Sequence, residues 1–362
     1  MTQNGEVQKS KFETNIVLIV NPSSCSGTTG KNWENIHNKL KLTLGEDPIV
    51  LFTEKSGDGT TLTREFLRKG FRNVIALGGD GTINEVVNGF FEGISSEERR
   101  PSFAVDRSSS DITLKSINPR AILGIFPSGT RNVLAKSLHL PDGGIIESCK
   151  SFVNNKRPIM IDVISAVATE SSDQLRPTVT QPYVYLNAAE IGIGAEIIDR
   201  SKKVREMVKS RIVSTVSSIV ATIPAYQSNI CEISIDDGAK NILTKVTMCI
   251  VANGSYLGGG FKAAPKAEVS DGLLDLVILK NSGSFKILDE LVKMKTVDGD
   301  SDTVDKVDDY LNDKDILYLH AKKVQLKPQH EKARITVAID GELIGILPAT
   351  FQVHHNALTV RL

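Results

Sequence analysis

The sequence predicts an α/β domain followed by a mainly β domain, because the pattern of apolar residues changes between the two halves of the chain. In the first half, short β-branched runs such as 15–20 and 73–77 alternate with segments of helical pattern. From about residue 159 onward, short alternating runs separated by turn residues are typical of antiparallel strands. A chain of 362 residues also exceeds the roughly 250 to 300 residues that one hydrophobic core usually serves.

The first half is expected to form a doubly wound domain with a parallel sheet. Strands are predicted over 15–20, 49–53, 73–77 and 121–126, with helices from about Lys31, over 61–69, from about Thr82 and over 132–138. Ligands of such sheets bind beyond the carboxyl ends of the strands. The loops after Val20, Leu77 and Phe126 are therefore the expected binding loops.

The composition limits the partners that the chain can have. The 43 basic and 43 acidic side chains cancel, so no global positive field would attract nucleic acid. The polar N-terminus is followed only by the short apolar run 16–20, which fits neither a signal peptide nor a membrane span. We expect a cytoplasmic protein without a nucleic-acid partner. The sequence leaves the oligomeric state open, and a homodimer is compatible with it.

The strongest chemical motif is the glycine-rich loop Gly78-Gly79-Asp80-Gly81-Thr82. Its glycines follow a predicted strand and precede a predicted helix, so backbone N–H groups can approach phosphate oxygens closely. Thr82 and Glu85 have the spacing of a capping box, which would fix the start of that helix. Asp80 would lie beside the phosphates, where a carboxylate can hold Mg²⁺ or accept a proton. The alternative is a glycine-rich hairpin without a ligand.

Two other motifs are weaker than they first look. Gly30-Lys31 resembles the end of a P-loop, but the pattern needs glycine at position 25 and Ser or Thr at position 32, where this chain has Cys25 and Asn32. The acidic segment 298–315 has aspartates at the first positions of an EF-hand loop but lacks its glycine and its final glutamate, which favours a solvated linker. The polar stretch 95–118 is expected to be a surface insertion.

Four segments in this order resemble the diacylglycerol kinase catalytic-domain family of bacterial and archaeal lipid kinases. They are GGDGTINEVVNG (78–89), FPSGTRNVLAKSLHLP (126–141), SDGLLDLVIL (270–279) and AIDGE (338–342). Sphingosine kinases share this superfamily, and NAD kinases share the GGDG loop. The resemblance implies a Rossmann-like N-terminal domain and a β-sandwich domain, with ATP bound in the cleft between them. The nucleotide-binding domain would span 1–153, and the C-terminal segment 352–362 would return to it. The β-sandwich domain would span 154–351 and bind lipid and metal.

The resemblance also implies roles for single residues. Glu342 would be the general base that removes the proton from the lipid hydroxyl, and Asp271 the side-chain ligand of a structural Mg²⁺ completed by main-chain oxygens of Glu268 and Leu273. Asp275 is a less certain ligand. The nucleotide would contact Asn21, Thr53, Gly78, Gly79, Asp80, Gly81, Thr82, Ile83, Asn84 and Thr130. Cys25 departs from the family, which usually has glycine there, so a requirement for positive φ would make the first loop differ locally.

A basic helix offers a route to the lipid. A helix is predicted over 195–223, and its segment 199–211 holds six basic and two acidic residues beside an apolar face. Such a segment can lie on an anionic membrane, and a solvated helix face over the β domain is an equal alternative. The protein would then be peripheral at the membrane.

Several functions stay open at this point. An ATP-dependent lipid kinase with a diacylglycerol-like acceptor is the leading interpretation, and a sphingoid-base kinase is its nearest rival. An NAD kinase would use the GGDG loop similarly, and a non-catalytic nucleotide sensor would keep the fold without turnover. No local motif specifies the acyl chains of the lipid, because selectivity depends on the shape of a pocket.

Overall fold

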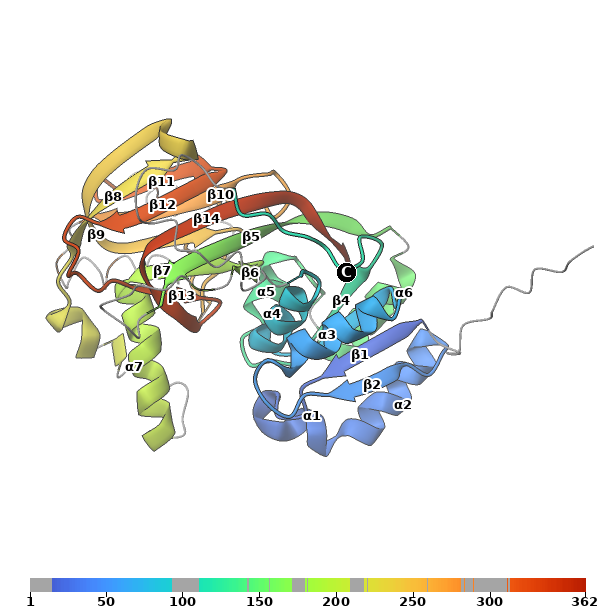
Figure 1. Cartoon of the computed structure of the whole chain (residues 1–362). Helices are drawn as coiled ribbons and strands as arrows, with labels where there is room; N and C mark the ends of the chain where they lie inside the picture. The colour runs from blue at the N-terminus through green and yellow to red at the C-terminus, as the bar shows by residue number, and fades with distance from the viewer. Residues whose placement is uncertain are drawn as a thin grey trace, which may run out of the picture.

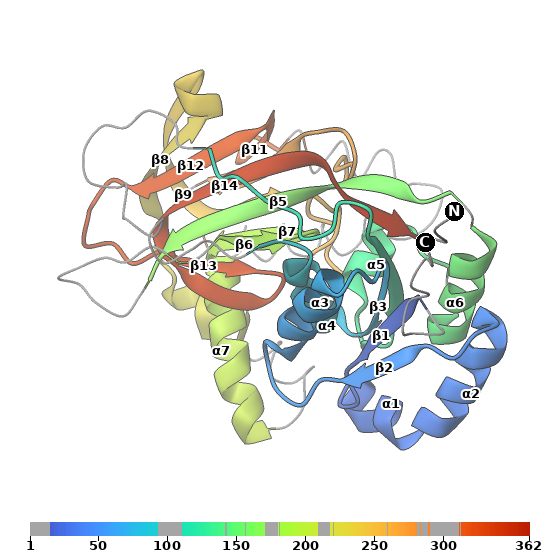
Figure 2. The same cartoon turned by 45° about the vertical axis from the view of Figure 1, so that its right-hand side comes forward.

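The computed structural model describes residues 15–92, 111–141, 143–155, 157–170, 180, 182–208, 218–219, 221–258, 260–280, 283, 289, 311 and 313–362. Figures 1 and 2 show two lobes, an α/β lobe from the first part of the chain and a β lobe from the second, with two long strands running between them. The candidate site lies where these lobes meet.

The α/β lobe is built on a parallel sheet with the strand order β2-β1-β3-β4. These strands are β1 (Ile16–Val20), β2 (Ile49–Phe52), β3 (Asn73–Gly78) and β4 (Ile122–Pro127). All residues of β1, and nearly all of β3 and β4, are buried, as their continuous apolar runs predict for strands covered on both faces. The carboxyl ends of all four strands point toward the same edge of the sheet.

Helices cover both faces of this sheet. On one face, α2 (Trp33–Leu44) and α6 (Gly144–Asn154) pack through Leu40, Cys149 and Phe152 against alternate residues of the strands. The helices α3 (Asp58–Arg68), α4 (Asp80–Gly89) and α5 (Val133–Ser137) pack on the opposite face. The short elements η1 (Cys25–Gly27) and α1 (Thr28–Lys31) follow β1.

The β lobe pairs its strands in antiparallel fashion around an apolar core. Its strands are β5 (Ile159–Thr169), β6 (Tyr183–Tyr185), β7 (Ala188–Gly192), β8 (Asn229–Ile235), β9 (Lys240–Ala252), β10 (Leu274–Lys280), β11 (Ile316–Ala321), β12 (Lys323–Pro328), β13 (Thr336–Ile339) and β14 (Glu342–Arg361). The remaining short elements are η2 (Ile223–Ala225) and η3 (Asp236–Gly238).

Strand β14 connects the two lobes. It begins beside β13, pairs with β12 and β5, and ends in parallel with β4, where Val360 faces Leu123. Its register with β5 shifts between His354 and Leu358. The buried Asp162 of β5 supports this irregular stretch, because its carboxylate accepts hydrogen bonds from the backbone N–H groups of Asn356 (2.8 Å) and Gly272 (2.7 Å). Backbone pairing therefore joins the lobes in addition to side-chain contacts.

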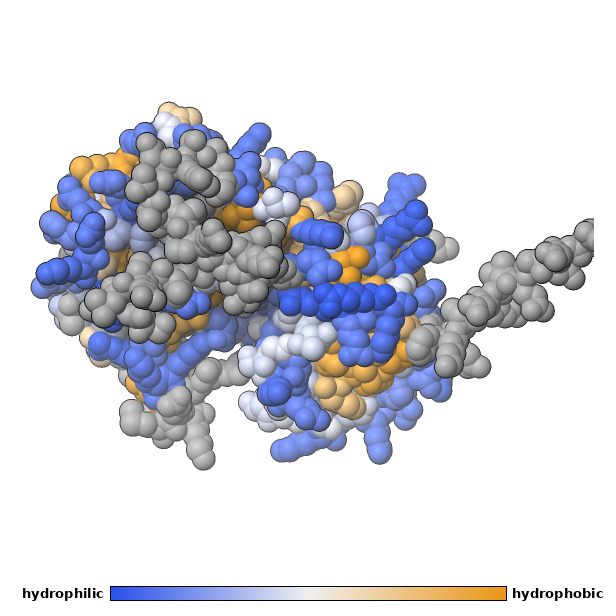
Figure 3. All heavy atoms as spheres, viewed as in Figure 1, coloured by the Kyte–Doolittle hydropathy of each residue, from blue (hydrophilic) through white to orange (hydrophobic). Residues whose placement is uncertain are grey.

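Helix α7 (Ile193–Val208) packs on the outer face of the sheet formed by β7 and β9. The helix predicted over 195–223 thus begins two residues earlier, and most of its second half lies outside the described residues. Figure 3 shows a mainly hydrophilic face with smaller hydrophobic patches. In the part of the chain that the structure describes, no helix has the length and apolar character needed to cross a membrane.

The end of the polar stretch 95–118 has a structural role. Residues 93–110 are outside the description, but Leu114 and Ile117 pack against the core of the α/β lobe. Asp111 forms an ion pair of 3.0 Å with Lys323 of β12, and the backbone N–H of Ile112 donates to Gln352 Oε1 at 2.8 Å. This end of the stretch therefore bridges the two lobes, which its polar composition did not indicate.

The contact between α3 and α4 depends on a residue without a side chain. A Cβ added to Gly89 of α4 would lie 2.3 Å from Cβ of Thr63 and 2.9 Å from the carbonyl oxygen of Thr60. We expect Gly89→Ala to lower the free energy of unfolding by about 1 to 3 kcal/mol, because the helices must separate. The matched control is Gly81→Ala on the same helix, where a Cβ would have no neighbour within 4 Å. Equal melting temperatures for the two variants would contradict this account.

Candidate functional site

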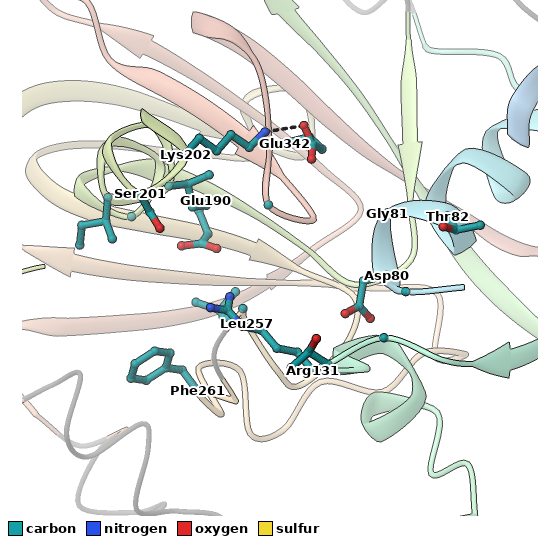
Figure 4. Close-up of a pocket in the computed structure, with 18 of the residues that line it drawn as sticks. Asp80, Gly81, Thr82, Arg131, Glu190, Ser201, Lys202, Leu257, Phe261 and Glu342 are labelled. Carbon is teal, nitrogen blue, oxygen red and sulfur yellow. Dashed lines mark hydrogen bonds and ion pairs between the residues drawn. The ribbon is translucent and has the colours of Figure 1, made fainter. Parts of the chain in front are cut away.

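The three loops predicted from the sequence meet at one cavity. The loops after β1, β3 and β4 all contribute to its wall, and the cavity has a volume of about 480 Å³. From these loops the cavity is lined by Asn21, Ser23, Ser24, Cys25, Gly79, Asp80, Gly81, Thr82, Gly129, Thr130 and Arg131. Its other wall comes from the β lobe, and Figure 4 shows side chains from both lobes pointing into it.

Two glycines in the cavity loops, Gly78 and Gly129, leave no room for a side chain. A Cβ on Gly78 would lie 2.4 Å from Cβ of Thr82, and a Cβ on Gly129 would lie 2.8 Å from Cα of Gly79. Asn21 Nδ2 donates a hydrogen bond of 3.0 Å to Thr82 Oγ1, which joins the first loop to the second. The N-terminus of α4 at Asp80 thus faces the cavity, where its free N–H groups and dipole favour an anion.

The predicted capping box of Thr82 and Glu85 is wrong. Helix α4 begins at Asp80, so Thr82 lies inside the helix and does not cap it. The carboxylate of Glu85 instead accepts hydrogen bonds from the backbone N–H groups of Gly57 (2.9 Å) and Gly59 (3.0 Å) at the start of α3. Glu85 therefore satisfies free donors of a neighbouring helix.

Asp80 connects the second and third loops. Its Oδ1 accepts a hydrogen bond of 3.1 Å from the backbone N–H of Leu134, which caps the start of α5. Burial raises the pKa of Asp80, and the hydrogen bonds and the charge of Arg131 only partly offset this effect. Asp80 is therefore a partly desolvated carboxylate at the anion-binding end of the cavity.

Glu342 comes from the opposite lobe and faces the same cavity. It is the first residue of β14, directly after the tight turn formed by Asp340 (φ 46°) and Gly341 (φ 83°). Lys202 of α7 reaches it, with Nζ 2.5 Å from Glu342 Oε2 (Figure 4). The side chain of Glu342 is 58% exposed, so the carboxylate remains accessible to a molecule that enters the cavity.

Asp340 holds this turn against the α/β lobe. Its Oδ2 accepts a hydrogen bond of 2.8 Å from Asn84 Nδ2 of α4, and its Oδ1 accepts one of 3.0 Å from the backbone N–H of Ala188. We call these two hydrogen bonds the Asp340 clamp. Burial raises the pKa of Asp340 to about 7. Because the folded state binds this proton more tightly than the unfolded state, the contribution of Asp340 to stability falls as the pH rises from about 4 to 7.

A largely apolar wall occupies the rest of the cavity. It is formed by side chains of α7, of the chain between α7 and η2, of β9, of β10 and of the segment between β9 and β10. These side chains are Ile193, Ile197, Ile198, Ile219, Met248, Leu257, Phe261 and Leu279. Glu190 of β7 also lines the cavity. Glu190, Arg131, Lys202 and Asp340 were not predicted as site residues. Arg131 and Asp340 lie within the motifs 126–141 and 338–342, which offered a signal for them. Lys202 was assigned only to the basic segment 199–211, and no local motif distinguishes Glu190.

Four residues assigned to nucleotide binding do not line the cavity. Thr53 is buried at the end of β2, where its backbone N–H donates to the carbonyl of Val20 at 2.9 Å. Ile83 is part of the apolar core under α4, Gly78 lies behind the loop, and Asn84 binds Asp340. These residues support the loop from behind, and their contact with a nucleotide stays a prediction.

Cys25 shows how the first loop accommodates its departure from the family. Cys25 and Ser26 adopt left-handed conformations with φ of 51° and 56°, followed by Gly27 at 83°. Two non-glycine residues in this region are unfavourable by about 1 to 2 kcal/mol each. Ser24 stabilises the turn, because its hydroxyl bonds to the carbonyl of Asn21 (2.8 Å) and to Thr29 Oγ1 (2.7 Å).

The turn that would hold a structural Mg²⁺ has a suitable but sparse donor set. Asp271 is exposed, and its Oδ1 accepts a hydrogen bond of 2.9 Å from the backbone N–H of Leu273. Glu268 is also exposed, three residues earlier. Asp275 is buried and accepts a hydrogen bond from the Tyr318 hydroxyl, so its carboxylate is not exposed beside Asp271 on the surface of this turn. No group of three or more His, Cys, Asp or Glu residues that could hold a metal occurs among the described residues, and most of 298–315 lies outside them.

Comparison with known proteins assigns both lobes. Residues 15–166 match the diacylglycerol kinase catalytic domain, and residues 187–362 match the YegS C-terminal NAD kinase β sandwich-like domain. The expected order of an α/β domain and a β-sandwich domain is confirmed at this level. The fold is similar to the crystal structure of a diacylglycerol kinase from Bacillus anthracis, with a TM-score of 0.62, 22% identity and 98% coverage of both chains.

Two similar proteins, which align with this chain over two thirds or more of their length, are named as a diacylglycerol kinase and a probable lipid kinase. The chain is 26% identical to the diacylglycerol kinase of Bacillus subtilis over 336 residues, which cover 92% of this chain and 91% of that protein. It is 29% identical to a probable lipid kinase, YegS-like, of Chromohalobacter salexigens over 250 residues, which cover 68% of this chain and 67% of that protein. Both domains, in this order, show that the chain belongs to the diacylglycerol kinase catalytic-domain family.

Proposed function

We propose that this protein is a lipid kinase that transfers the γ-phosphate of ATP to the hydroxyl of a diacylglycerol-like lipid. One observation carries the proposal: a single cavity combines the N-terminus of α4, the carboxylate of Glu342 and an apolar wall. These are the three environments that a phosphate donor, a reacting hydroxyl and a hydrocarbon chain require. The protein's membership of the diacylglycerol kinase catalytic-domain family supports the same reaction.

ATP would bind with its phosphates at the α4 end of the cavity. The backbone N–H groups around Gly79, Gly81 and Thr82 would bind phosphate oxygens, and Thr130 and Arg131 would approach them from the third loop. Mg²⁺, when bound with the nucleotide, would neutralise charge on the phosphates, and Asp80 is the carboxylate placed to hold it. A second, structural Mg²⁺ at Asp271 fits the oxygen donors of that turn.

Glu342 would accept the proton of the attacking hydroxyl. Its carboxylate faces the phosphate-binding loops across the cavity, and it is accessible enough to meet a substrate. Lys202 pairs with one carboxylate oxygen and thereby holds the side chain in the cavity. Most of the barrier reduction in phosphoryl transfer comes from positioning and from cationic groups, so the proton transfer is one contribution among several.

The other functions fit the cavity less well. A non-catalytic sensor would have no need for both Asp80 and Glu342 in one cavity. An NAD kinase would present a polar nucleotide to the wall formed by Ile193, Ile197 and Phe261, which is apolar. A sphingoid base would suit that wall as well as a glycerolipid does, and it is the alternative acceptor for the transfer assay.

The decisive assay is transfer of labelled γ-phosphate from ATP, with Mg²⁺, to diacylglycerols, sphingoid bases and NAD, resolved by chromatography. We expect label in diacylglycerol. We also expect Glu342→Gln to lower turnover by a factor of about 100 or more, because the amide cannot accept the proton of the lipid hydroxyl. ATP binding should be retained.

The control for this substitution is Glu331→Gln, which neutralises an exposed glutamate outside the cavity lining and should leave turnover unchanged. Full activity of Glu342→Gln would remove Glu342 from the mechanism. Label only in NAD, or no label despite ATP binding, would contradict the lipid kinase.

We also propose that α7 contacts the lipid surface. Lys203 projects from this helix with 72% of its side chain exposed and forms a surface ion pair with Asp199 of the same helix. Lys202 instead pairs with Glu342 at the cavity. Lys203→Gln should weaken binding to anionic vesicles about fivefold, as expected for the loss of about 1 kcal/mol from one basic residue. Sedimentation with vesicles measures this, and Lys327→Gln on β12 is the control. Equal binding of the two variants would exclude this role of α7.

A further inference from the structure

Glu190 is a cavity-lining carboxylate that accepts no side-chain hydrogen bond from the described part of the chain. Its side chain points into the cavity (Figure 4), yet no group of the described residues donates a hydrogen bond to it. Asp275 on the same outer face of the β lobe shows the usual arrangement, because it accepts a hydrogen bond from Tyr318 and lies 3.2 Å from His320 Nε2. A carboxylate in this partly buried position, without such partners, has its hydrogen-bonding capacity free for a ligand that enters the cavity.

The surroundings of Glu190 leave room for its carboxylate. Glu190 lies two residues after Ala188 on β7, so both side chains are on the same face of the strand. Ala188 belongs to the apolar cluster that includes Met248 and Ile250, and Glu190 therefore points toward this cluster. Gly194, the second residue of α7, has no side chain, and a Cβ there would lie 2.6 Å from Glu190 Oε2. The carboxylate therefore fills the space that a residue larger than glycine would occupy.

Glu190 also lies at the border between the polar and apolar parts of the cavity. Arg131 and Lys202 line the cavity on the polar side, and the charges of Arg131 and Asp340 act on the Glu190 carboxyl. Apolar side chains of α7 and β9, such as Ile193, Ile197 and Met248, form the other side. A lipid with its hydroxyl at Glu342 and its chains along the apolar wall would place its polar backbone at Glu190.

We propose that Glu190 binds the polar backbone of the lipid acceptor and selects a neutral glycerolipid. This inference rests on the proposed lipid kinase function. The ester oxygens of a glycerolipid can accept hydrogen bonds from the protonated Glu190 carboxyl and from nearby cations. The ammonium group of a sphingoid base can only donate hydrogen bonds, so it would need Glu190 in its ionised form instead of as a hydrogen-bond donor.

The pH dependence of lipid binding separates these two acceptors. Burial and the neighbouring Asp340 raise the pKa of Glu190 to about 7. Asp80, Arg131 and the Lys202–Glu342 pair are further charged groups, among the described residues, that line the cavity. Below pH 7 the carboxyl group carries the proton that an ester oxygen can accept. We therefore expect the affinity for dioctanoylglycerol to fall as the pH rises above 7, and Glu190→Gln to remove this dependence. A rise in affinity with pH, or tighter binding of sphingosine, would overturn the choice of a neutral lipid.

The test measures dioctanoylglycerol binding by calorimetry without ATP, beside KM values from the transfer assay. Glu190→Leu should weaken binding and raise the lipid KM about 10-fold or more, as the loss of one hydrogen bond to an ionisable group implies, with the ATP KM within about twofold. Gly194→Ala should have a similar effect, because its Cβ displaces the carboxylate. Glu232→Leu, at an exposed site on β8, is the control and should change neither value.

The outcomes separate the two proposals. Unchanged lipid affinity in a folded Glu190→Leu variant, or no binding of dioctanoylglycerol by the unaltered protein, would overturn the role of Glu190 even if a lipid is phosphorylated. Glu190-dependent binding without phosphate transfer would support that role and remove the proposed function. The melting temperature of Glu190→Leu at pH 8 should not fall, because the substitution removes an unpartnered charge, and a fall would indicate a structural role instead.

Discussion

The Asp340 clamp is the interaction on which the candidate site depends. Asn84 of α4 belongs to the α/β lobe, while Asp340 and Ala188 belong to the β lobe. The hydrogen bond from Asn84 therefore joins the lobes behind the cavity, and the one from Ala188 holds Asp340 in place within the β lobe. Asn84 lies on the helix whose N-terminus faces the cavity, and Asp340 lies two residues before Glu342. The clamp thus fixes the anion-binding end of α4 and the carboxylate of Glu342 relative to each other. Its buried donors and acceptors need each other, because an unpaired partner would be unfavourable there.

Backbone hydrogen bonds between strands also join the two lobes. Strand β14 begins at Glu342 in the site and ends beside β4 in the α/β lobe, with β5 paired along it (Figure 2). A strand that is hydrogen-bonded in both lobes limits how far they can separate. The ion pair between Asp111 and Lys323 adds a further tie at a distance from the cavity. The cavity is therefore formed where the two lobes join. Its phosphate-loop end comes from the α/β lobe, and its apolar wall comes from the β lobe.

The sequence predicted the parts of the fold that local patterns encode. Apolar runs gave the strands β1 to β4 within one or two residues, and the rule that ligands bind at carboxyl ends selected the three loops that line the cavity. It could not predict contacts between residues far apart in the chain. Asn84 and Asp340 are separated by 256 positions, and Glu85 caps a different helix from the one its spacing indicates. Glu342 entered through a family motif, whereas Lys202 and Glu190 became visible only when α7 and β7 were folded around the cavity.

A double-mutant cycle between Asn84 and Asp340 tests the clamp most directly. The readouts are the free energy of unfolding and phosphate transfer for Asn84→Ala, Asp340→Ala and the double variant. If the clamp joins the lobes, Asn84→Ala will be less harmful once Asp340 is already alanine than in the natural protein. The shared hydrogen bond is then absent, and only the hydrogen bonds of Asn84 with Val184 and Asn88 remain to be lost. Effects of the two substitutions that simply add, as expected for Asn84→Ala combined with Glu331→Ala at a distant exposed site, would contradict the account.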